Sequence, residues 1–245
     1  MARVETYARD KVHGGKLGAF REKVTALVEA SRAGSPVRLD WFSNDETSEA
    51  AGIAIHRDDD AITAHLERLA PAYQDLLTVA DLMTIDQLGG RVTGPVAKAF
   101  GQEPRHFDFD DGVHEVPDFD PEDGVIEIFT RFFINPGELE TFQAYADEIL
   151  AIVREKDPGT IRYDWFYDKA GEQCIAMDTY AGWDGTVTHM KNCHEPHDAL
   201  LKHSKMITEF LGRLKPDLEA RLASFKPYVF QFDAGLKPYS TGLNA

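Results

Sequence analysis

Cysteine and positive charge are both scarce in this sequence. Only two cysteines, Cys174 and Cys193, occur among 245 residues. A disulfide framework is not expected in a chain so poor in cysteine, so we expect two buried or half-buried thiols. Lysine and arginine number 26 against 42 aspartates and glutamates, which gives a net charge of -16. This charge disfavours nucleic acid and anionic membrane surfaces as partners.

Long apolar runs and nucleotide-binding loops are also missing. No apolar run approaches the roughly 20 residues that a membrane helix needs, and the first residues lack the basic and apolar regions of a secretory signal. Gly14-Gly15 and Gly89-Gly90 belong to no dinucleotide or Walker pattern, and no Gly-x-Ser-x-Gly elbow occurs. We therefore expect a cytoplasmic protein with no cofactor.

What the sequence does contain is an internal duplication. Val37–Phe42 reads VRLDWF and Ile161–Phe166 reads IRYDWF. A histidine follows the tryptophan of each copy at the same distance, so His65 corresponds to His189 at an offset of 124 positions, as Trp41 does to Trp165. A period of this length indicates a duplicated domain. We expect a degenerate first repeat at 1–113, an acidic linker at 114–124, and a second repeat at 125–245 that holds the active copy.

The pattern of apolar residues in each repeat predicts strands and helices in the order β-α-β-β-α-β. In the second repeat, residues 125–134 alternate as a strand, and apolar residues from Leu139 to Val153 recur at helical spacing. The hairpin 160–168 and 172–180 follows, with 36–44 and 49–56 as its first-repeat counterpart. This is the ferredoxin-like plan, an α+β fold. Its bare sheet faces predict that the two antiparallel sheets pack into one intrachain α/β barrel.

Charges of both signs recur on the strand face away from the helices. They are Glu5, Arg9, Arg38 and Asp40 in the first repeat and Glu127, Arg131, Arg162 and Asp164 in the second. Phenylalanines share this face, so we predict that the charges are buried and paired, because isolated buried charges are costly.

Several segments together resemble the antibiotic biosynthesis monooxygenase (ABM) family of the dimeric α/β-barrel superfamily. They are Pro158–Phe166, Glu172–Cys174, the helix that carries His189, the segment Leu218-Glu219-x-x-Leu222, and Gly235-Leu236. The resemblance covers most of 125–236 and, more faintly, 3–113. It implies a barrel that other members close by pairing two chains and that this chain closes by itself, with further association into a homodimer left open.

The resemblance also implies a range of activities. Members oxygenate phenols and quinols with molecular oxygen and no cofactor, degrade haem, or isomerise lactones. Oxygenating members carry a tryptophan nine residues before the helix histidine and an asparagine four residues before that tryptophan. Here Tyr180 and His56 stand at the tryptophan positions, and Ala176 and Gly52 at the asparagine positions. The chain thus departs from the family pattern at both.

His189 is the leading catalytic candidate. A neutral imidazole beside an apolar pocket could take a proton from a phenol, and a histidine near this place binds iron in haem-binding relatives. The alternative is a histidine that anchors the helix to the sheet, a structural role that the presence of His65 at the matching place also indicates.

A cluster peculiar to the second repeat follows His189 along the chain. It comprises Cys193, His194, Glu195, His197 and His203. His194 and His197 share a helix face and could hold a divalent metal with a third ligand. Exposed polar groups are the favoured interpretation, so we predict no metal site here.

Aromatic residues complete the predicted pocket. Beside the catalytic set His189, His194 and Tyr180, the predicted substrate-binding residues are Trp165, Tyr163, Met177 and His197, with His65, His56 and Trp41 as first-repeat equivalents. Large aromatics at strand spacing usually build core, and that interpretation is favoured for the two tryptophans. The sequence predicts a cofactor-independent monooxygenase that acts with molecular oxygen on a small aromatic or quinol-like molecule. The alternative is a non-catalytic binder of a small molecule or haem.

Overall fold

The computed structural model describes residues 3–34, 36–114, 125–212 and 228–236. Their elements follow in chain order: β1 (Val4–Val12), α1 (Leu17–Ser31), β2 (Arg38–Asn44), β3 (Glu49–His56), α2 (Asp59–Leu76), β4 (Ala80–Leu88), α3 (Gly94–Phe100), β5 (Arg105–His114), β6 (Val125–Ile134), α4 (Leu139–Lys156), β7 (Thr160–Asp168), β8 (Gln173–Ala181), α5 (Gly182–Asn192), α6 (His194–Leu200), β9 (Ser204–Gly212) and β10 (Tyr228–Gly235). The strand order β1-β3-β2-β10-β9-β6-β8-β7-β5-β4 is that of a closed barrel. The predicted α+β barrel of ferredoxin-like repeats is confirmed.

The chain divides into two compact units, each of which is described by itself. Unit 1 comprises Met1–Phe107 and Phe230–Ala245, and unit 2 comprises Asp108–Val229. The repeat boundaries at 113 and 125 stay a prediction. Apart from His114, the predicted acidic linker lies outside the described residues, as does the predicted Leu218–Leu222 segment.

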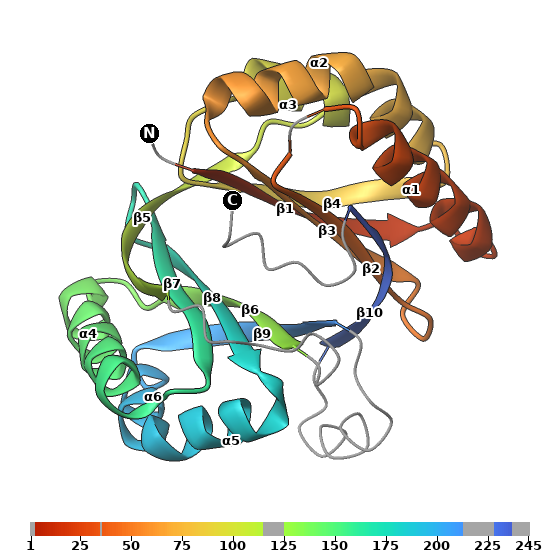
Figure 1. The fold of residues 1–245 in the computed structure, drawn as a ribbon. Coiled ribbons are helices and arrows are strands. Elements are labelled where there is room, and N and C mark those ends of the chain that lie inside the picture. The colour runs from red at the N-terminus through yellow and green to blue at the C-terminus, as the bar shows by residue number, and fades with distance from the viewer. Residues whose placement is uncertain (1–2, 35, 115–124, 213–227, 237–245) are drawn as a thin grey trace. The chain divides into compact units, whose positions relative to one another are not determined.

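In unit 1, the strands are hydrogen-bonded in the order β10-β2-β3-β1-β4-β5. Neighbours are antiparallel except β4 and β5, which are parallel. Helices α1, α2 and α3 lie on one face of this sheet (Figure 1). The core between the helices and the sheet is built by apolar side chains from both. Its members include Phe20, Val24, Trp41, Ile62, Leu66 and Val96.

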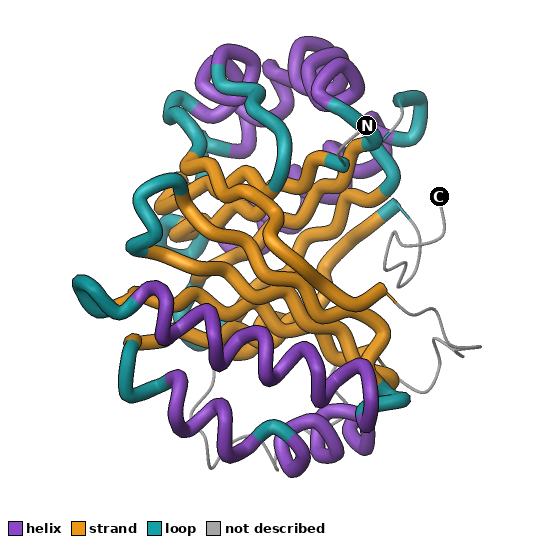
Figure 2. Tube along the Cα trace, turned by 90° about the vertical axis from the view of Figure 1, so that its left-hand side faces the viewer, coloured by secondary structure: helices purple, strands orange, loops and turns teal. Residues whose placement is uncertain are grey.

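Unit 2 repeats this plan with β9-β6-β8-β7, all antiparallel, and the helices α4, α5 and α6. Figure 2 shows helices against one side of the strands in each unit. Trp165 lies in the unit 2 core, stacked on Phe132 at 5.6 Å between ring centroids and edge-on to Phe142 at 6.0 Å. The favoured interpretation of Trp165 as a core residue fits this packing.

The two units also share their strand register. Val4 pairs with His56 in β1 and β3, and Ile126 pairs with Tyr180 in β6 and β8. His56 and Tyr180 are therefore separated by the same 124 positions as Trp41 and Trp165. The helical segment after β3 in unit 1 differs from the one after β8 in unit 2. Helix α2 is continuous, whereas its counterpart is divided at Cys193 into α5 and α6.

The charged strand face is buried, as predicted. Arg38 Nε donates to Asp40 Oδ2 at 2.5 Å, and Arg162 Nε donates to Asp164 Oδ2 at the same distance. All four side chains are at most 3% exposed. The same pair therefore recurs at the same strand position in each unit.

Part of the last strand of each repeat belongs to the other repeat's compact unit. Strand β10 pairs with β2 in unit 1, where Phe232 meets Phe42 edge-on at 5.7 Å. Residues of β5 from Asp108 onward belong to unit 2, where Phe109 meets Phe166 at 5.6 Å. Among the helices of the described segments, none combines the length and apolar character that crossing a membrane requires.

Candidate active site in the second unit

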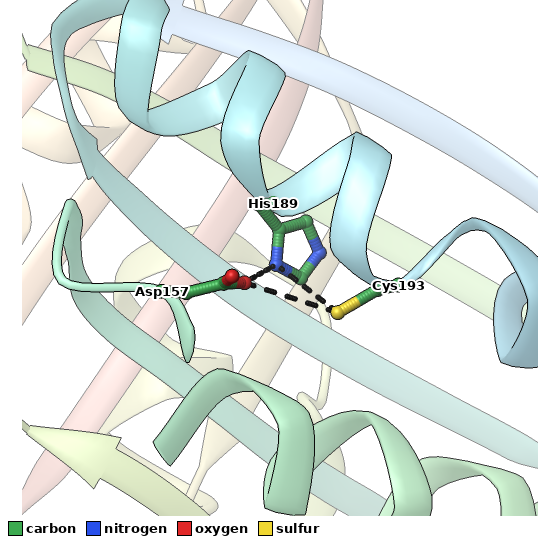
Figure 3. Close-up of side chains that lie close together, drawn as sticks. All are labelled: Asp157, His189 and Cys193. Atoms are coloured by element: carbon green, nitrogen blue, oxygen red, sulfur yellow. Dashed lines mark hydrogen bonds and ion pairs between the residues drawn. The ribbon is translucent and has the colours of Figure 1, made fainter. Parts of the chain in front are cut away.

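Three side chains from neighbouring elements of unit 2 lie close together. Asp157 directly follows α4, His189 lies in the last turn of α5, and Cys193 separates α5 from α6 (Figure 3). His189 Nδ1 is 2.9 Å from Asp157 Oδ2 and 3.7 Å from Cys193 Sγ, and that sulfur is 3.8 Å from the same carboxylate oxygen. All three residues are at most 5% exposed. We call them the Asp-His-Cys cluster.

Two glycines allow α5 to approach the loop after Asp157. A Cβ on Gly185 would lie 2.9 Å from the backbone oxygen of Gly159, and a Cβ on Gly159 would lie 2.8 Å from Gly185 Cα. Ala181 N also donates to Gly159 O at 2.8 Å. This approach holds the start of α5 against the loop and so positions His189 over Asp157.

The carboxylate of Asp157 is ionised. Burial by itself would raise its pKa, but hydrogen bonds from His189 and Asn192 outweigh burial, and the net shift is downward. Asn192 Nδ2 donates to Asp157 Oδ1 at 2.5 Å. Because a carboxylate can only accept, His189 Nδ1 carries the proton in their hydrogen bond. In the neutral form of the imidazole, the lone pair is therefore on Nε2.

Aromatic rings surround His189. Tyr163 from β7 and Tyr180 from β8 lie 5.0 Å and 5.1 Å from its ring, and His197 from α6 lies 5.2 Å away. Tyr163 Oη and His197 Nε2 are 3.2 Å apart. Burial, reinforced by His189, lowers the pKa of His197 to about 3, so this ring is neutral. Burial likewise raises the pKa of both tyrosines well above the ordinary value.

A buried carboxylic acid lies on the same side of the sheet. Asp178 on β8 is the cross-strand neighbour of Tyr163, and its Oδ1 has no hydrogen-bond partner in the described part of the chain. Burial, together with repulsion from Asp164, raises the pKa of Asp178 well above its usual range. A protonated Asp178 can donate a hydrogen bond, which an ionised one cannot.

The other predicted site residues lie elsewhere. His194 is exposed and pairs with Asp198 at 3.8 Å. His203 contacts Glu138 at 2.8 Å. Met177 is buried, but strand alternation places it on the opposite face of β8 from Tyr180. The structure thus groups His189, Tyr180, Tyr163 and His197 of the predicted set, and their roles stay predictions.

Unit 1 holds a simpler version of this arrangement. His65 Nε2 is 3.1 Å from Tyr73 Oη, and the His56 ring lies 4.9 Å from His65. Burial lowers the pKa of His56 to about 3 and that of His65 to about 4. At the offset of 124, Leu69 replaces Cys193 and Ala54 replaces Asp178.

Sequence reasoning missed Asp157 and Asp178. Neither residue is among the candidates that the sequence pattern singles out, and Asp178 lies there only within the predicted strand 172–180. A residue-by-residue comparison of the repeats carries the signal, since Ala33 and Ala54 stand at these places in the first repeat. Acids gained in one copy at positions that are apolar in the other point to a site in that copy.

Several solved structures share the fold of this chain. No protein-family model matches the chain, and no curated protein matches it. The chain is similar in structure to a candidate monooxygenase from Fusobacterium nucleatum subsp. nucleatum, with a TM-score of 0.61 at 11% identity over 83% of this chain and 89% of the other.

Two further structures show the same similarity. A candidate monooxygenase from Lactobacillus acidophilus aligns with a TM-score of 0.55 at 9% identity, over 85% of this chain and 92% of the other. An anthrone oxidase-like protein aligns with a TM-score of 0.51 at 9% identity, over 84% and 89%. The resemblance to the ABM-like proteins is therefore confirmed at the level of the fold.

Proposed function

We propose that this protein is a cofactor-independent monooxygenase of small aromatic or quinol-like molecules, with unit 2 as the catalytic unit. The observation that carries the proposal is the hydrogen bond between Asp157 and His189. It fixes the Nδ1–H tautomer and leaves Nε2 as a base, enclosed by the rings of Tyr163, Tyr180 and His197. The names of the three solved structures support the same class of reaction.

The chemistry requires little from the protein beyond a base and a dry, aromatic surrounding. Nε2 of His189 takes the proton of an acidic phenol or activated methylene, and the resulting anion is electron-rich enough to reduce molecular oxygen. For a methylene carbon, one oxygen atom forms the new carbonyl and the other leaves as water with the two hydrogens. The substrate supplies all four electrons, so no flavin or metal is needed for the balance.

The protonated Asp178 and the two tyrosines, Tyr163 and Tyr180, are suited to stabilise the substrate anion that forms in this step. Their hydroxyl groups are neutral because burial raises their pKa values. Neutral donors in a buried setting stabilise negative charge that develops on a substrate oxygen. We assign Asp157 to hold His189 in its tautomer, and we propose that the protein acts in the cytoplasm.

The test is oxygen consumption with a panel of hydroquinones and anthrones. His189→Gln should lower kcat by about 100-fold to 10,000-fold, the usual contribution of a general base, without loss of folding. The matched control is His194→Gln, five residues along the chain and exposed, which should leave the rate unchanged. Equal rates for wild type and His189→Gln would refute the proposal.

The same Nε2 lone pair also favours a second candidate, a non-catalytic haem-binding or small-molecule-binding protein. An imidazole whose Nδ1 is held by a carboxylate is well suited to bind haem iron through Nε2. Addition of haemin should then produce a Soret band that His189→Gln abolishes, with no consumption of oxygen.

A further inference from the structure

We propose that Asp157, His189 and Cys193 form a zinc site, with Asp157 Oδ2, His189 Nδ1 and Cys193 Sγ as its ligands (Figure 3). The three ligand atoms lie within 4.8 Å of one another, and their pairwise distances are 2.9, 3.7 and 3.8 Å. Zinc bonds of about 2.0 to 2.3 Å at tetrahedral angles hold ligand atoms roughly 3.3 to 3.7 Å apart. The cluster therefore needs only sub-ångström shifts to accept the ion.

The donor set selects the kind of metal. A thiolate, an imidazole nitrogen and one carboxylate oxygen suit zinc, whereas calcium and magnesium prefer sites made of oxygen alone. Three protein ligands leave the fourth position to solvent or a substrate atom. These are also not the ligands that the sequence suggests, since His194 is exposed and His197 bonds to Tyr163.

Surrounding groups already hold the ligands in place. Asn192 donates to Asp157 Oδ1, which leaves Oδ2 directed at His189 and Cys193. Cys193 N donates to His189 O at 2.9 Å, so the thiol and the imidazole are one helical turn apart. In unit 1 the place of Cys193 is taken by Leu69, so the same set of ligands is not repeated there.

Zinc binding at this site would change which nitrogen of His189 carries the proton. Without metal, His189 Nδ1 donates its proton to Asp157 Oδ2 in a hydrogen bond, and the Cys193 thiol faces the same oxygen at 3.8 Å. On binding, the thiol proton leaves to solvent and the imidazole proton moves from Nδ1 to Nε2. The two charges of zinc are then matched by the thiolate and the carboxylate. Protonated Nε2 cannot act as a base, so zinc should inhibit the enzyme, a consequence that rests on the proposed function.

Cobalt(II) titration of the intact 245-residue chain tests the site without any substrate. One equivalent should produce the near-ultraviolet absorption of a cobalt-thiolate bond, and zinc should displace it. Cys193→Ser should abolish this band. Cys174→Ser is the matched control, because Cys174 is the other buried thiol, and it should retain the band. Asn192→Ala, which removes the hydrogen bonds to Asp157 Oδ1 and to Lys156 O, should weaken cobalt binding by about 10-fold to 100-fold.

Three outcomes overturn the site: no cobalt-thiolate band in wild type, a band that survives Cys193→Ser, or a band lost in Cys174→Ser. If Cys193→Ser does not fold, Asp157→Asn replaces it, and unchanged cobalt affinity in that variant overturns the site. Oxygen uptake is measured separately in the presence of one equivalent of zinc. A cobalt-thiolate band together with uptake that zinc does not inhibit would support the site and contradict the role of His189 as the base.

Discussion

At the scale of single residues, the molecule tolerates ionisable groups in its interior by keeping them neutral. Tyr163, Tyr180 and Asp178 retain their protons because burial raises their pKa values, and His56 and His197 lose theirs because burial lowers them. Charge is retained where an opposite charge is adjacent, as in Arg162 and Asp164. Desolvation that no adjacent opposite charge offsets therefore decides the protonation state of Tyr163, Tyr180, Asp178, His56 and His197.

Asp10 provides a measurable case in unit 1. It is 1% exposed, its Oδ2 has no hydrogen-bond partner in the described residues, and burial raises its pKa to about 7. Between about pH 4 and pH 7 the folded state holds a proton that the unfolded state has lost. The free energy of unfolding should thus fall by about 1.4 kcal/mol per pH unit from this group and level off above pH 7.

Asp10→Asn should remove that slope and stabilise the protein at about pH 8, by up to roughly 4 kcal/mol. Urea unfolding at a series of pH values measures it. The control is Asp147→Asn, an exposed aspartate on α4, which should leave the slope as in wild type. A slope unchanged by Asp10→Asn would show that Asp10 is ionised in the folded protein.

At the scale of elements, the site depends on the placement of α5. Its histidine reaches Asp157 only because Gly185 and Gly159 bring helix and loop backbones together. The split of the helix at Cys193 places the thiol at the junction of α5 and α6. In unit 1 the corresponding α2 is continuous, so the two helical regions present different side chains to similar sheets.

Gly185→Ala should therefore displace α5. Its Cβ would meet backbone atoms, which cannot rotate away, so we expect a loss of about 1 to 3 kcal/mol in stability and altered NMR signals from His189. Gly18→Ala on α1 is the control, since nothing lies within 4 Å of its added Cβ. That change should stabilise the protein by about 0.5 to 1 kcal/mol. Unaltered His189 signals in Gly185→Ala would show that the loop moves instead.

At the scale of the whole chain, the compact units do not follow the repeats. Strand β10 belongs to the second repeat in sequence but completes the sheet of unit 1 beside β2. Gly235 makes this pairing close, because a Cβ there would lie 2.0 Å from Asp40 Oδ1. Gly112 of β5 stands in the same relation to Asp164 in unit 2.

Deletion of residues 228–245 should accordingly weaken unit 1, although it removes the end of the second repeat. Strand β2 would become an edge, and Phe42 would lose its contact with Phe232. Amide hydrogen exchange should show reduced protection in β2. Protection in β2 equal to that of the intact chain would contradict this pairing. Strand β6, paired with β8 and β9, is the internal reference.

The sequence by itself determined the repeated architecture. Periodic apolar residues and the two Arg-x-Asp-Trp-Phe hairpins fix strands, helices and their order, because these patterns are local and each must bury one face. It also predicted a site at His189, Tyr180, Tyr163 and His197, since they stand out by type and by their counterparts, and their roles stay predictions.

Only the tertiary structure decided which acid meets His189. Asp157 and His189 are 32 positions apart, and nothing local to either residue encodes their contact; it exists because α4 and α5 pack on one sheet. His194 is exposed for a related reason, because a helix carries side chains to both the buried and the exposed side. Burial then set the protonation states, and burial is a property of the fold.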